Sequence, residues 1–160
     1  MSVVTADIFD AHHAIVGVCD VQFRSFGKRV DFFGPCATLR VAEDHVPLRV
    51  ALSEPGEGRV LVVDAGGMRV GVFGDQMAER AIRNGWAGVV IFGAMRDSAT
   101  INELDIGVKA VAVTARRCLV ATEGERDVVV SFGGVSFATG DWVYADADSV
   151  VRSPVELVLE

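Results

Sequence analysis

Two short, continuous runs of apolar residues near the middle of the chain limit its fold more than any other feature. Residues 60–63 read Val-Leu-Val-Val, and residues 89–92 read Val-Val-Ile-Phe. Such runs are typical of strands that are buried on both faces, as in parallel sheets covered by helices. Between them, Asp75 is a good helix N-cap before an apolar stripe that an Asn-Gly pair ends, which predicts a helix at residues 76–84. We therefore expect a parallel β-α-β unit in the middle of the chain.

The segments around this unit predict further strands, several of them antiparallel. Gly133-Gly134 separates residues 128–132, which are apolar except for Ser131, from residues 135–138, and this is typical of a hairpin with a two-residue turn. Other strands are expected at residues 37–41, 70–73, 109–113, 142–144 and 150–151, and short helices are expected from Pro47 and through Leu104. Parallel units with antiparallel hairpins around them predict a layered α/β fold with mixed sheets.

The composition is typical of one globular domain with an acidic surface. The chain has 160 residues, 51% of them hydrophobic, and contains no linker or internal repeat, so residues 1–160 are expected to form a single domain. The formal net charge of −7 argues against direct binding of nucleic acid, because phosphate backbones repel an acidic surface. A basic protein segment, or a small anion in a locally positive pocket, is compatible with this charge.

The sequence carries neither a recognisable export signal nor a membrane segment. The first ten residues lack a basic start followed by an apolar segment, and no apolar run approaches the ~18 residues of a membrane span. Cys19, Cys36 and Cys118 are odd in number and lack Cys-x-x-Cys spacing, so reduced and mostly buried thiols are expected. We expect a cytoplasmic protein that does not contact membranes.

Two dipeptides, Gly74-Asp75 and Arg96-Asp97, form the best candidate for a functional site. The residues between them are enough for one helix, one turn and one strand. If Asp75 begins a helix at one edge of the sheet, the strand at residues 89–92 returns the chain to that edge, and Arg96-Asp97 emerges beside the start of the helix. The carboxyl ends of parallel strands are where α/β sheets usually bind ligands.

These residue types suit a metal-assisted reaction on a small 2-oxo acid. The free backbone N–H groups of Gln76 and Met77, together with the helix dipole, suit a carboxylate, and Arg96 adds planar donors with a fixed positive charge. Asp97 offers a hard oxygen ligand for Mg²⁺ or Mn²⁺. Such an ion could chelate a 2-oxo acid and stabilise the enolate that forms in retro-aldol cleavage or β-decarboxylation.

The same dipeptides also have a purely structural explanation, because an aspartate at a helix N-cap and an Arg-Asp pair in a loop are both common. Spacing alone leaves this alternative open. Asp64-Ala-Gly-Gly, which follows a strand, indicates a turn, since it lacks the G-x-G-x-x-G pattern of a nucleotide or S-adenosylmethionine site. His12-His13 and His45 lack the spacing of a zinc site, which favours surface or capping roles.

At Gly74-Asp75 and Arg96-Asp97 the chain resembles the RraA-like family, which includes class II 4-hydroxy-4-methyl-2-oxoglutarate aldolases and the regulator of ribonuclease E activity A. The resemblance covers nearly the whole chain. Further matching segments are Asp20-Val-Gln-Phe, Phe33-Gly-Pro, Gly58-Arg-Val-Leu-Val-Val-Asp, Gly85-Trp-Ala-Gly-Val-Val-Ile, Leu104-Asp-Ile-Gly, Phe132-Gly-Gly-Val and Gly140-Asp-Trp-Val-Tyr-Ala-Asp.

The resemblance implies a swivelling β/β/α-type fold and a ring-shaped homotrimer with active sites near subunit boundaries. It also implies roles for the candidate residues. Arg96 would bind substrate and stabilise the enolate, and Asp97 would hold the metal. Asp75 would position a water that protonates the enolate, and the amides of residues 74–77 would bind the substrate carboxylate.

The resemblance therefore implies a metal-dependent aldolase that cleaves 4-hydroxy-4-methyl-2-oxoglutarate-like substrates to pyruvate, with oxaloacetate decarboxylase activity. The alternative is a non-catalytic regulator that binds and inhibits ribonuclease E. Regulatory members of the family look as though they have lost the aspartate after the arginine, and this chain retains Asp97, which favours the enzyme. A demethylmenaquinone methyltransferase activity is not expected, because no S-adenosylmethionine motif is present.

Overall fold

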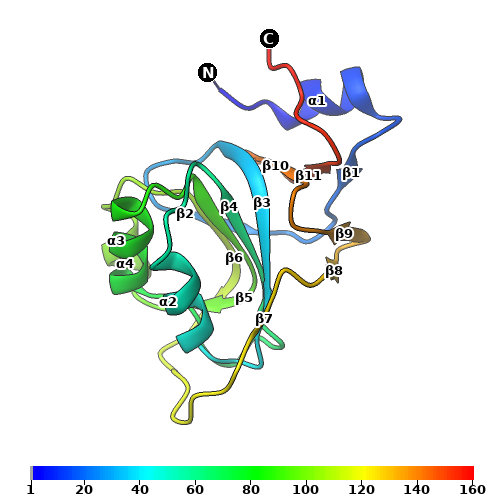
Figure 1. Ribbon diagram of the computed structural model, residues 1–160. Helices are drawn as coiled ribbons and strands as arrows, with labels where there is room; N and C mark the ends of the chain where they lie inside the picture. Colours follow the sequence, from blue (N-terminus) through cyan, green and yellow to red (C-terminus); the bar gives the residue numbers. More distant parts are fainter. Residues whose placement is uncertain (1) are drawn as a thin grey trace.

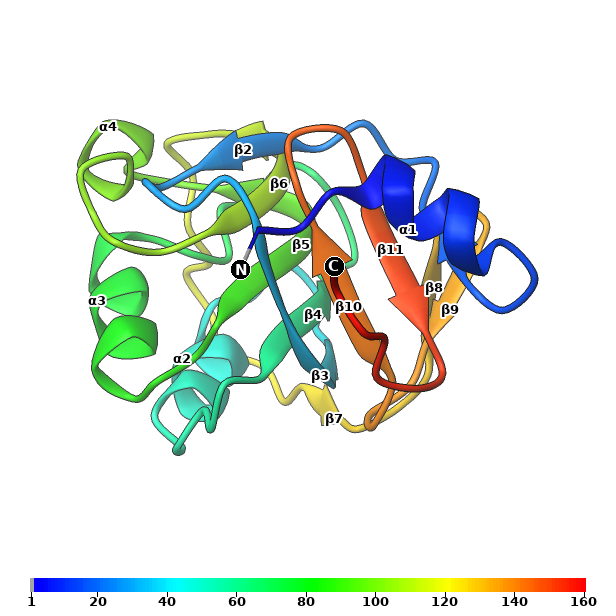
Figure 2. The same cartoon turned by 90° about the horizontal axis from the view of Figure 1, so that it is seen from above.

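A curled mixed sheet of nine strands forms the centre of the molecule (Figures 1 and 2). The computed structural model describes residues 2–160. The helices are α1 (Thr5–His12), α2 (Val46–Leu52), α3 (Asp75–Arg83) and α4 (Ser98–Ile101). The strands are β1 (Gly17–Val18), β2 (Arg24–Phe26), β3 (Phe32–Arg40), β4 (Val60–Asp64), β5 (Gly88–Met95), β6 (Val108–Val113), β7 (Glu125–Arg126), β8 (Val130–Phe132), β9 (Val135–Phe137), β10 (Trp142–Ala145) and β11 (Val150–Ser153). Strands β8 and β9 form a hairpin outside the main sheet.

Four neighbouring strands in the sheet, β3 to β6, run parallel to one another. In this register, Val62 of β4 lies between Thr38 of β3 and Val90 of β5. Residues 60–63 and 89–91 are fully buried, which explains why their sequence is continuously apolar. The predicted parallel β-α-β unit is confirmed, and α3 is its connecting helix.

Helices α2, α3 and α4 cover one face of these parallel strands (Figure 1). The small side chains of Ala78 and Ala81 on α3 are fully buried in the core that the helices share with the sheet. The predicted helix is confirmed with a shift of one residue. It begins at Asp75, and Gly74 takes the N-cap position for which the sequence favoured Asp75.

Strand β3 belongs to both the parallel and the antiparallel parts of the sheet. Residues 32–35 pair with β10 in the antiparallel direction, whereas residues 36–40 pair with β4 in the parallel direction. The hairpin of β8 and β9 turns at Gly133 and Gly134, whose φ angles of 59° and 77° are those that a type I′ turn requires. The predicted hairpin and the predicted α/β fold with mixed sheets are confirmed.

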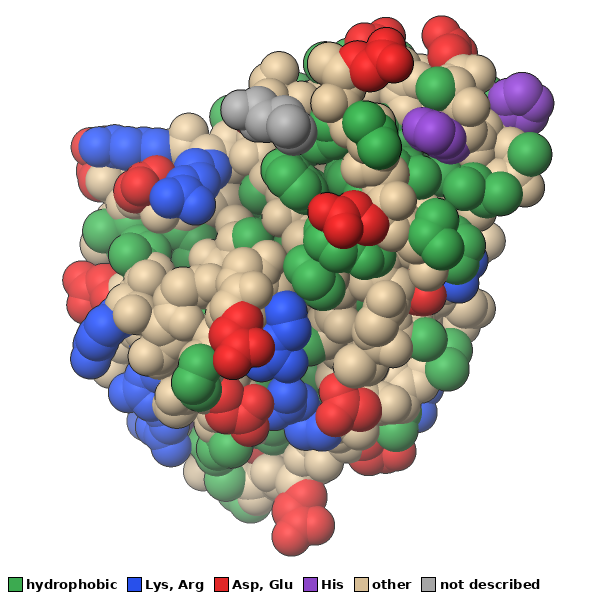
Figure 3. Space-filling view, turned by 45° about the horizontal axis from the view of Figure 1, so that its top comes forward, with side chains coloured by type: hydrophobic (Ala, Val, Ile, Leu, Met, Phe, Trp, Pro, Cys, Tyr) green, Lys and Arg blue, Asp and Glu red, His purple; other side chains and the backbone are tan. Residues whose placement is uncertain are grey.

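The second face of the sheet is covered by the β8–β9 hairpin, which packs Phe132 and Phe137 against Val62 and Val90. Helix α1 packs on the opposite face of β10 and β11, where Ile8 shares a further buried cluster with Tyr144 and Leu157. Figure 3 shows hydrophobic side chains on the surface in this region. The exposed ones near α1 and the C-terminal end include Val4, Phe9, Ile15 and Val158. Within residues 2–160, no helix is long and apolar enough to cross a bilayer.

Some sequence predictions of local structure are wrong. Residues 70–73 form no strand, and Gly71 makes a single bridge to Ala94 at the end of β5. Val72 and Phe73 are apolar because they enter the core, not because they extend the sheet. Helix α4 ends at Ile101, earlier than the predicted helical stretch. Four elements were not predicted: α1, β1, β2 and β7.

The Phe32 ring is enclosed by two glycines, one in β5 and one just before β6. A Cβ atom on Gly88 would lie 2.4 Å from Phe32 Cδ2, and one on Gly107 would lie 2.2 Å from Cδ1. We therefore expect Gly88→Ala to lower the free energy of unfolding by about 1–3 kcal/mol, because overpacking displaces the ring. Phe32→Leu in the same chain should recover part of this loss.

Urea denaturation of the single and double variants measures both effects. Gly17→Ala is the matched control, because its Cβ would meet Val135 at an ordinary 3.4 Å, and a change within about 0.5 kcal/mol is expected. Equal stability of Gly88→Ala and the unsubstituted chain would contradict the enclosed position of Phe32.

Candidate active site

A pocket of about 380 Å³ opens where the start of α3 meets the end of β5. The predicted site residues all line it, namely Gly74, Asp75, Gln76, Met77, Arg96 and Asp97. The segment before α2 contributes His45, and the loop after β6 contributes Arg117. The convergence expected from the spacing of the two dipeptides is thus present, and the chemical role of each residue stays a prediction.

Two hydrogen bonds join the segments that carry the dipeptides. The N–H of Arg96 donates to the carbonyl oxygen of Phe73 at 2.8 Å, and the N–H of Asp75 donates to Oδ2 of Asp97 at 3.2 Å. Both follow from the parallel register, because α3 begins at the edge of the sheet where β5 ends. The positions of Arg96 and Asp97 are therefore determined by the backbone of the core.

Asp97 has the left-handed conformation, with φ 62° and ψ 38°, which aspartate tolerates better than most residues. This conformation turns its side chain toward Gly74, where a Cβ atom would lie 2.8 Å from Oδ2. Asp97 forms no salt bridge within residues 2–160. Because an ionised carboxylate has about four lone-pair positions and the Asp75 amide uses one, Asp97 retains capacity for a cation.

The side chain of Arg96 lies over Gly71. A Cβ atom at residue 71 would lie 2.4 Å from Cγ of Arg96, so the absence of a side chain there allows the arginine to pass. The amide of Gly71 donates to the carbonyl oxygen of Arg116 at 2.9 Å, which attaches this segment to the loop after β6. Arg96 enters no salt bridge within the described residues 2–160 and remains available to an anion.

The start of α3 differs from the expected carboxylate site in one respect. The N–H of Gln76 is not free, because it donates to Oδ1 of Asp75 at 2.8 Å. The N–H of Asp75 is taken by Asp97. The reason is that Asp75 is the first helical residue, so its side chain folds back onto the next amide. Met77 also lines the pocket.

The pocket gathers positive charge in a protein whose formal net charge is −7. Four arginines line it, Arg49, Arg80, Arg96 and Arg117, against two aspartates, Asp75 and Asp97. Guanidinium groups bind carboxylates through paired donors. The arrangement suits a small molecule with more than one carboxylate. It agrees with the expectation that a protein with an acidic net charge can still bind a small anion in a locally positive pocket.

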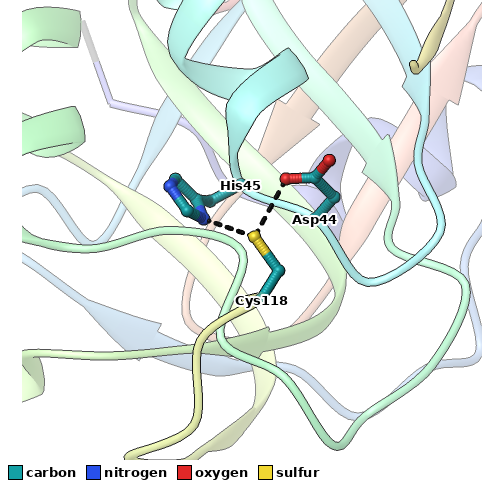
Figure 4. Close-up of side chains that lie close together, drawn as sticks. All are labelled: Asp44, His45 and Cys118. Atoms are coloured by element: carbon teal, nitrogen blue, oxygen red, sulfur yellow. Dashed lines mark hydrogen bonds between the residues drawn. The ribbon is translucent and has the colours of Figure 1, made fainter. Parts of the chain in front are cut away.

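A second group of side chains beside this pocket was missed by sequence reasoning. Asp44, His45 and Cys118 converge there (Figure 4). Sγ of Cys118 lies 3.0 Å from Oδ1 of Asp44 and 2.9 Å from Nδ1 of His45. His45 occupies the N-cap position of α2, but its side chain makes no capping hydrogen bond. No spacing rule could find this group, because Cys118 comes from a loop far along the chain.

Burial and hydrogen bonding determine the protonation of this group. Burial raises the pKa of the Asp44 carboxyl, but hydrogen bonds from the Thr122 and Val46 amides and from the Cys118 and Thr122 side chains outweigh it and lower the pKa to about 2. Burial lowers the pKa of His45, against the attraction of Asp44. Burial and the hydrogen bond to Asp44 raise the pKa of the Cys118 thiol. At neutral pH the group therefore holds one carboxylate, a neutral imidazole and a thiol.

The left-handed conformation of Asp97 leads to a stability prediction. Asp97→Asn should change the free energy of unfolding by no more than about 0.5 kcal/mol, because asparagine also tolerates this conformation and can still accept the Asp75 amide. Asp97→Ala should cost about 1 kcal/mol, because alanine does not. Urea denaturation gives both values, and equal stability of the two variants would argue against the left-handed backbone.

The chain has relatives along almost its whole length. The RraA-like family (Aldolase/RraA) matches residues 5–152. A protein of Alkalilimnicola ehrlichii with the provisional name 4-hydroxy-4-methyl-2-oxoglutarate aldolase is 48% identical over 159 residues, 99% of either chain. A Geobacillus kaustophilus structure described as an S-adenosylmethionine:2-dimethylmenaquinone methyltransferase superposes with a TM-score of 0.93 at 44% identity, covering 96% of each chain. The RNA-processing inhibitor RraA from Thermus thermophilus has a TM-score of 0.93 at 37% identity, covering 99% of this chain and 96% of its own. With a family match over nearly all of its residues and such relatives, this chain belongs to the RraA-like family.

Proposed function

We propose that this chain is a divalent-metal-dependent carbon–carbon lyase. It cleaves 4-hydroxy-4-methyl-2-oxoglutarate-like substrates to pyruvate and decarboxylates oxaloacetate to pyruvate. The proposal rests on one observation: Arg96, Asp97 and the start of α3 line the same pocket, together with three further arginines. The aldolase name of the Alkalilimnicola ehrlichii relative supports the same reaction class.

Asp97 fits the role of the metal ligand. Its carboxylate is a hard oxygen donor with lone pairs to spare, as Mg²⁺ and Mn²⁺ prefer, and Gly74 leaves space beside it. When bound, the cation would supply Lewis-acid polarisation of the oxygens of the 2-oxo acid. A single protein carboxylate would be enough to hold such an ion, because Mg²⁺ is often bound through only one or two carboxylates.

Arg96 would bind the 2-oxo acid and stabilise the negative charge that develops on its oxo group as the carbon–carbon bond breaks. A planar guanidinium can donate two hydrogen bonds at once, which an ammonium group cannot. Arg49, Arg80 and Arg117 would hold the second carboxylate of the substrate, since both proposed substrates are dicarboxylates. These side chains come from α2, α3 and the loop after β6.

Asp75 would position a water that delivers a proton to the carbon left after cleavage. Oδ1 of Asp75 is held by the Gln76 amide, so Oδ2 is the oxygen that remains to hold a water in the pocket. In aldol cleavage the substrate hydroxyl loses its proton to solvent and becomes the oxo group of one pyruvate, and in decarboxylation the other fragment leaves as CO₂. In both cases the electron pair of the broken bond passes to the oxo group of the 2-oxo acid, and it forms the new C–H bond when the proton from the water arrives. Pyruvate is then released.

The active form is proposed to be a homotrimer. The exposed hydrophobic side chains around α1 and the C-terminal end, including Phe9 and Val158, offer apolar area that association would cover.

The alternative function is regulation of an RNA-processing enzyme by direct binding. Its support is the similarity to the Thermus thermophilus inhibitor RraA, together with the acidic net charge of −7, which suits a basic protein segment. A pull-down with ribonuclease E at physiological salt tests it, and retention of the chain by ribonuclease E beads would support it.

The decisive experiment for the lyase is pyruvate release from oxaloacetate and from 4-hydroxy-4-methyl-2-oxoglutarate. Release should require Mg²⁺ or Mn²⁺ and should stop in EDTA, after subtraction of the metal's own decarboxylation of oxaloacetate. Asp97→Asn and Arg96→Lys should each lower kcat/KM by about 100-fold or more, because each removes a group that stabilises developing charge.

Two exposed residues away from the pocket provide matched controls. Asp7→Asn and Arg69→Lys change the same side-chain types without touching the pocket, and full activity is expected from both. Urea denaturation of each variant separates loss of activity from loss of fold. Asp97→Asn with undiminished metal-dependent activity would rule out the proposed ligand, and no release from either substrate would leave the regulator as the better explanation.

A further inference from the structure

The group formed by Asp44, His45 and Cys118 combines a carboxylate oxygen, an imidazole nitrogen and a thiol sulfur. The three ligand atoms lie within 4.8 Å of one another. They come from the segment before α2 and from the loop after β6, so only the folded chain brings them together. None of the three has a role in the proposed lyase mechanism.

The geometry argues against a nucleophilic cysteine. In a cysteine–histidine–aspartate triad the histidine lies between the other two residues, so that the carboxylate orients the imidazole. Here Asp44 contacts the sulfur itself, at 3.0 Å. The carboxylate and the imidazole both point at Cys118, and this convergence on one sulfur is the arrangement of a ligand set.

Asp44 is held in place by partners other than the thiol. Its Oδ1 accepts the Val46 amide at 2.8 Å, and its Oδ2 accepts both the amide and the hydroxyl of Thr122, the hydroxyl at 2.9 Å. The lone pair of Oδ1 that now accepts the thiol proton is the one that a cation would take. The remaining hydrogen bonds would keep the carboxylate oriented, as supporting partners do in metal sites.

We infer that Asp44, His45 and Cys118 form a binding site for a thiophilic divalent cation such as Zn²⁺, separate from the oxygen site proposed at Asp97. Sulfur, nitrogen and oxygen donors together select zinc and its chemical relatives over magnesium. Three protein ligands leave a fourth position for water or an anion. The thiol gives up its proton to solvent when the cation binds.

The position of the site connects it to the pocket. His45 is itself a lining residue, and Arg117, which precedes Cys118, is another. The loop is also joined to the Arg96 region through the hydrogen bond from Gly71 to Arg116. A cation at this site would therefore fix the loop, whose Leu119 and Val120 are otherwise 84% and 77% exposed, along one side of the pocket.

The test uses Co²⁺ as a probe with the metal-free, reduced, full-length chain. Bound cobalt should show the near-ultraviolet absorption band of a thiolate–cobalt bond. The intensity of this band should saturate at one cobalt per chain, and added Zn²⁺ should abolish the band by displacing the cobalt. Excess Mg²⁺ should leave it unchanged. Cobalt bound at Asp97 would have oxygen ligands and would not contribute to this absorption.

Cys118→Ser should remove the band, and His45→Gln should weaken cobalt binding by about 10-fold or more. Cys19→Ser and His12→Gln are the matched controls, since Cys19 and His12 lie outside the group, and both should keep the band. Asp97→Asn should also keep it, so the outcome is independent of the lyase proposal. Asp44 is left unsubstituted because it also holds Val46 and Thr122.

Urea denaturation shows whether the variants are folded before binding is compared. A cobalt band that survives in folded Cys118→Ser would overturn the inference. So would the absence of any thiolate–cobalt absorption in the unsubstituted chain at cobalt concentrations that saturate oxygen ligands.

Discussion

Strands β4 and β5 run parallel and in register, and this alignment determines where the pocket can form. Parallel strands must be joined by a crossover, so the helix that connects them begins at the same edge of the sheet at which the second strand ends. Asp75 at the start of α3 and Asp97 after β5 meet for this reason, and the amide of one contacts the carboxylate of the other. The buried valines that stabilise the sheet therefore also determine the geometry of the site.

The sequence was sufficient to predict this part of the molecule. The continuous apolar runs correspond to strands β4 and β5, in which residues 60–63 and 89–91 are fully buried, and Gly133-Gly134 forms the turn of the hairpin. The residues of the candidate site could be predicted because their meeting follows from one local unit of the chain. The sequence did not predict the hydrogen bonds at the start of α3. There the carboxylates of Asp97 and Asp75 accept the amides of Asp75 and Gln76, which were expected to bind the substrate carboxylate.

Features that depend on contacts between distant segments could not be predicted. Cys118 reaches His45 only because the loop after β6 folds back on α2, where Asp44 binds Thr122. Likewise, Val72 and Phe73 have the apolar character of a strand, yet they fill the core beside a single bridge to β5. Apolar periodicity reports that a residue is buried, and it does not distinguish burial in a sheet from burial in a loop.

The glycines at 71 and 74 have a consequence for comparing relatives of this chain. Arg96 and Asp97 can occupy their places only because neither glycine carries a side chain. A homologous protein that preserved the arginine and the aspartate, but carried a larger residue at either glycine position, would have the same two charged groups pointing elsewhere. Such a protein would carry the same motif with a different arrangement of its charged groups, so the residues at these two positions should be compared together with the motif.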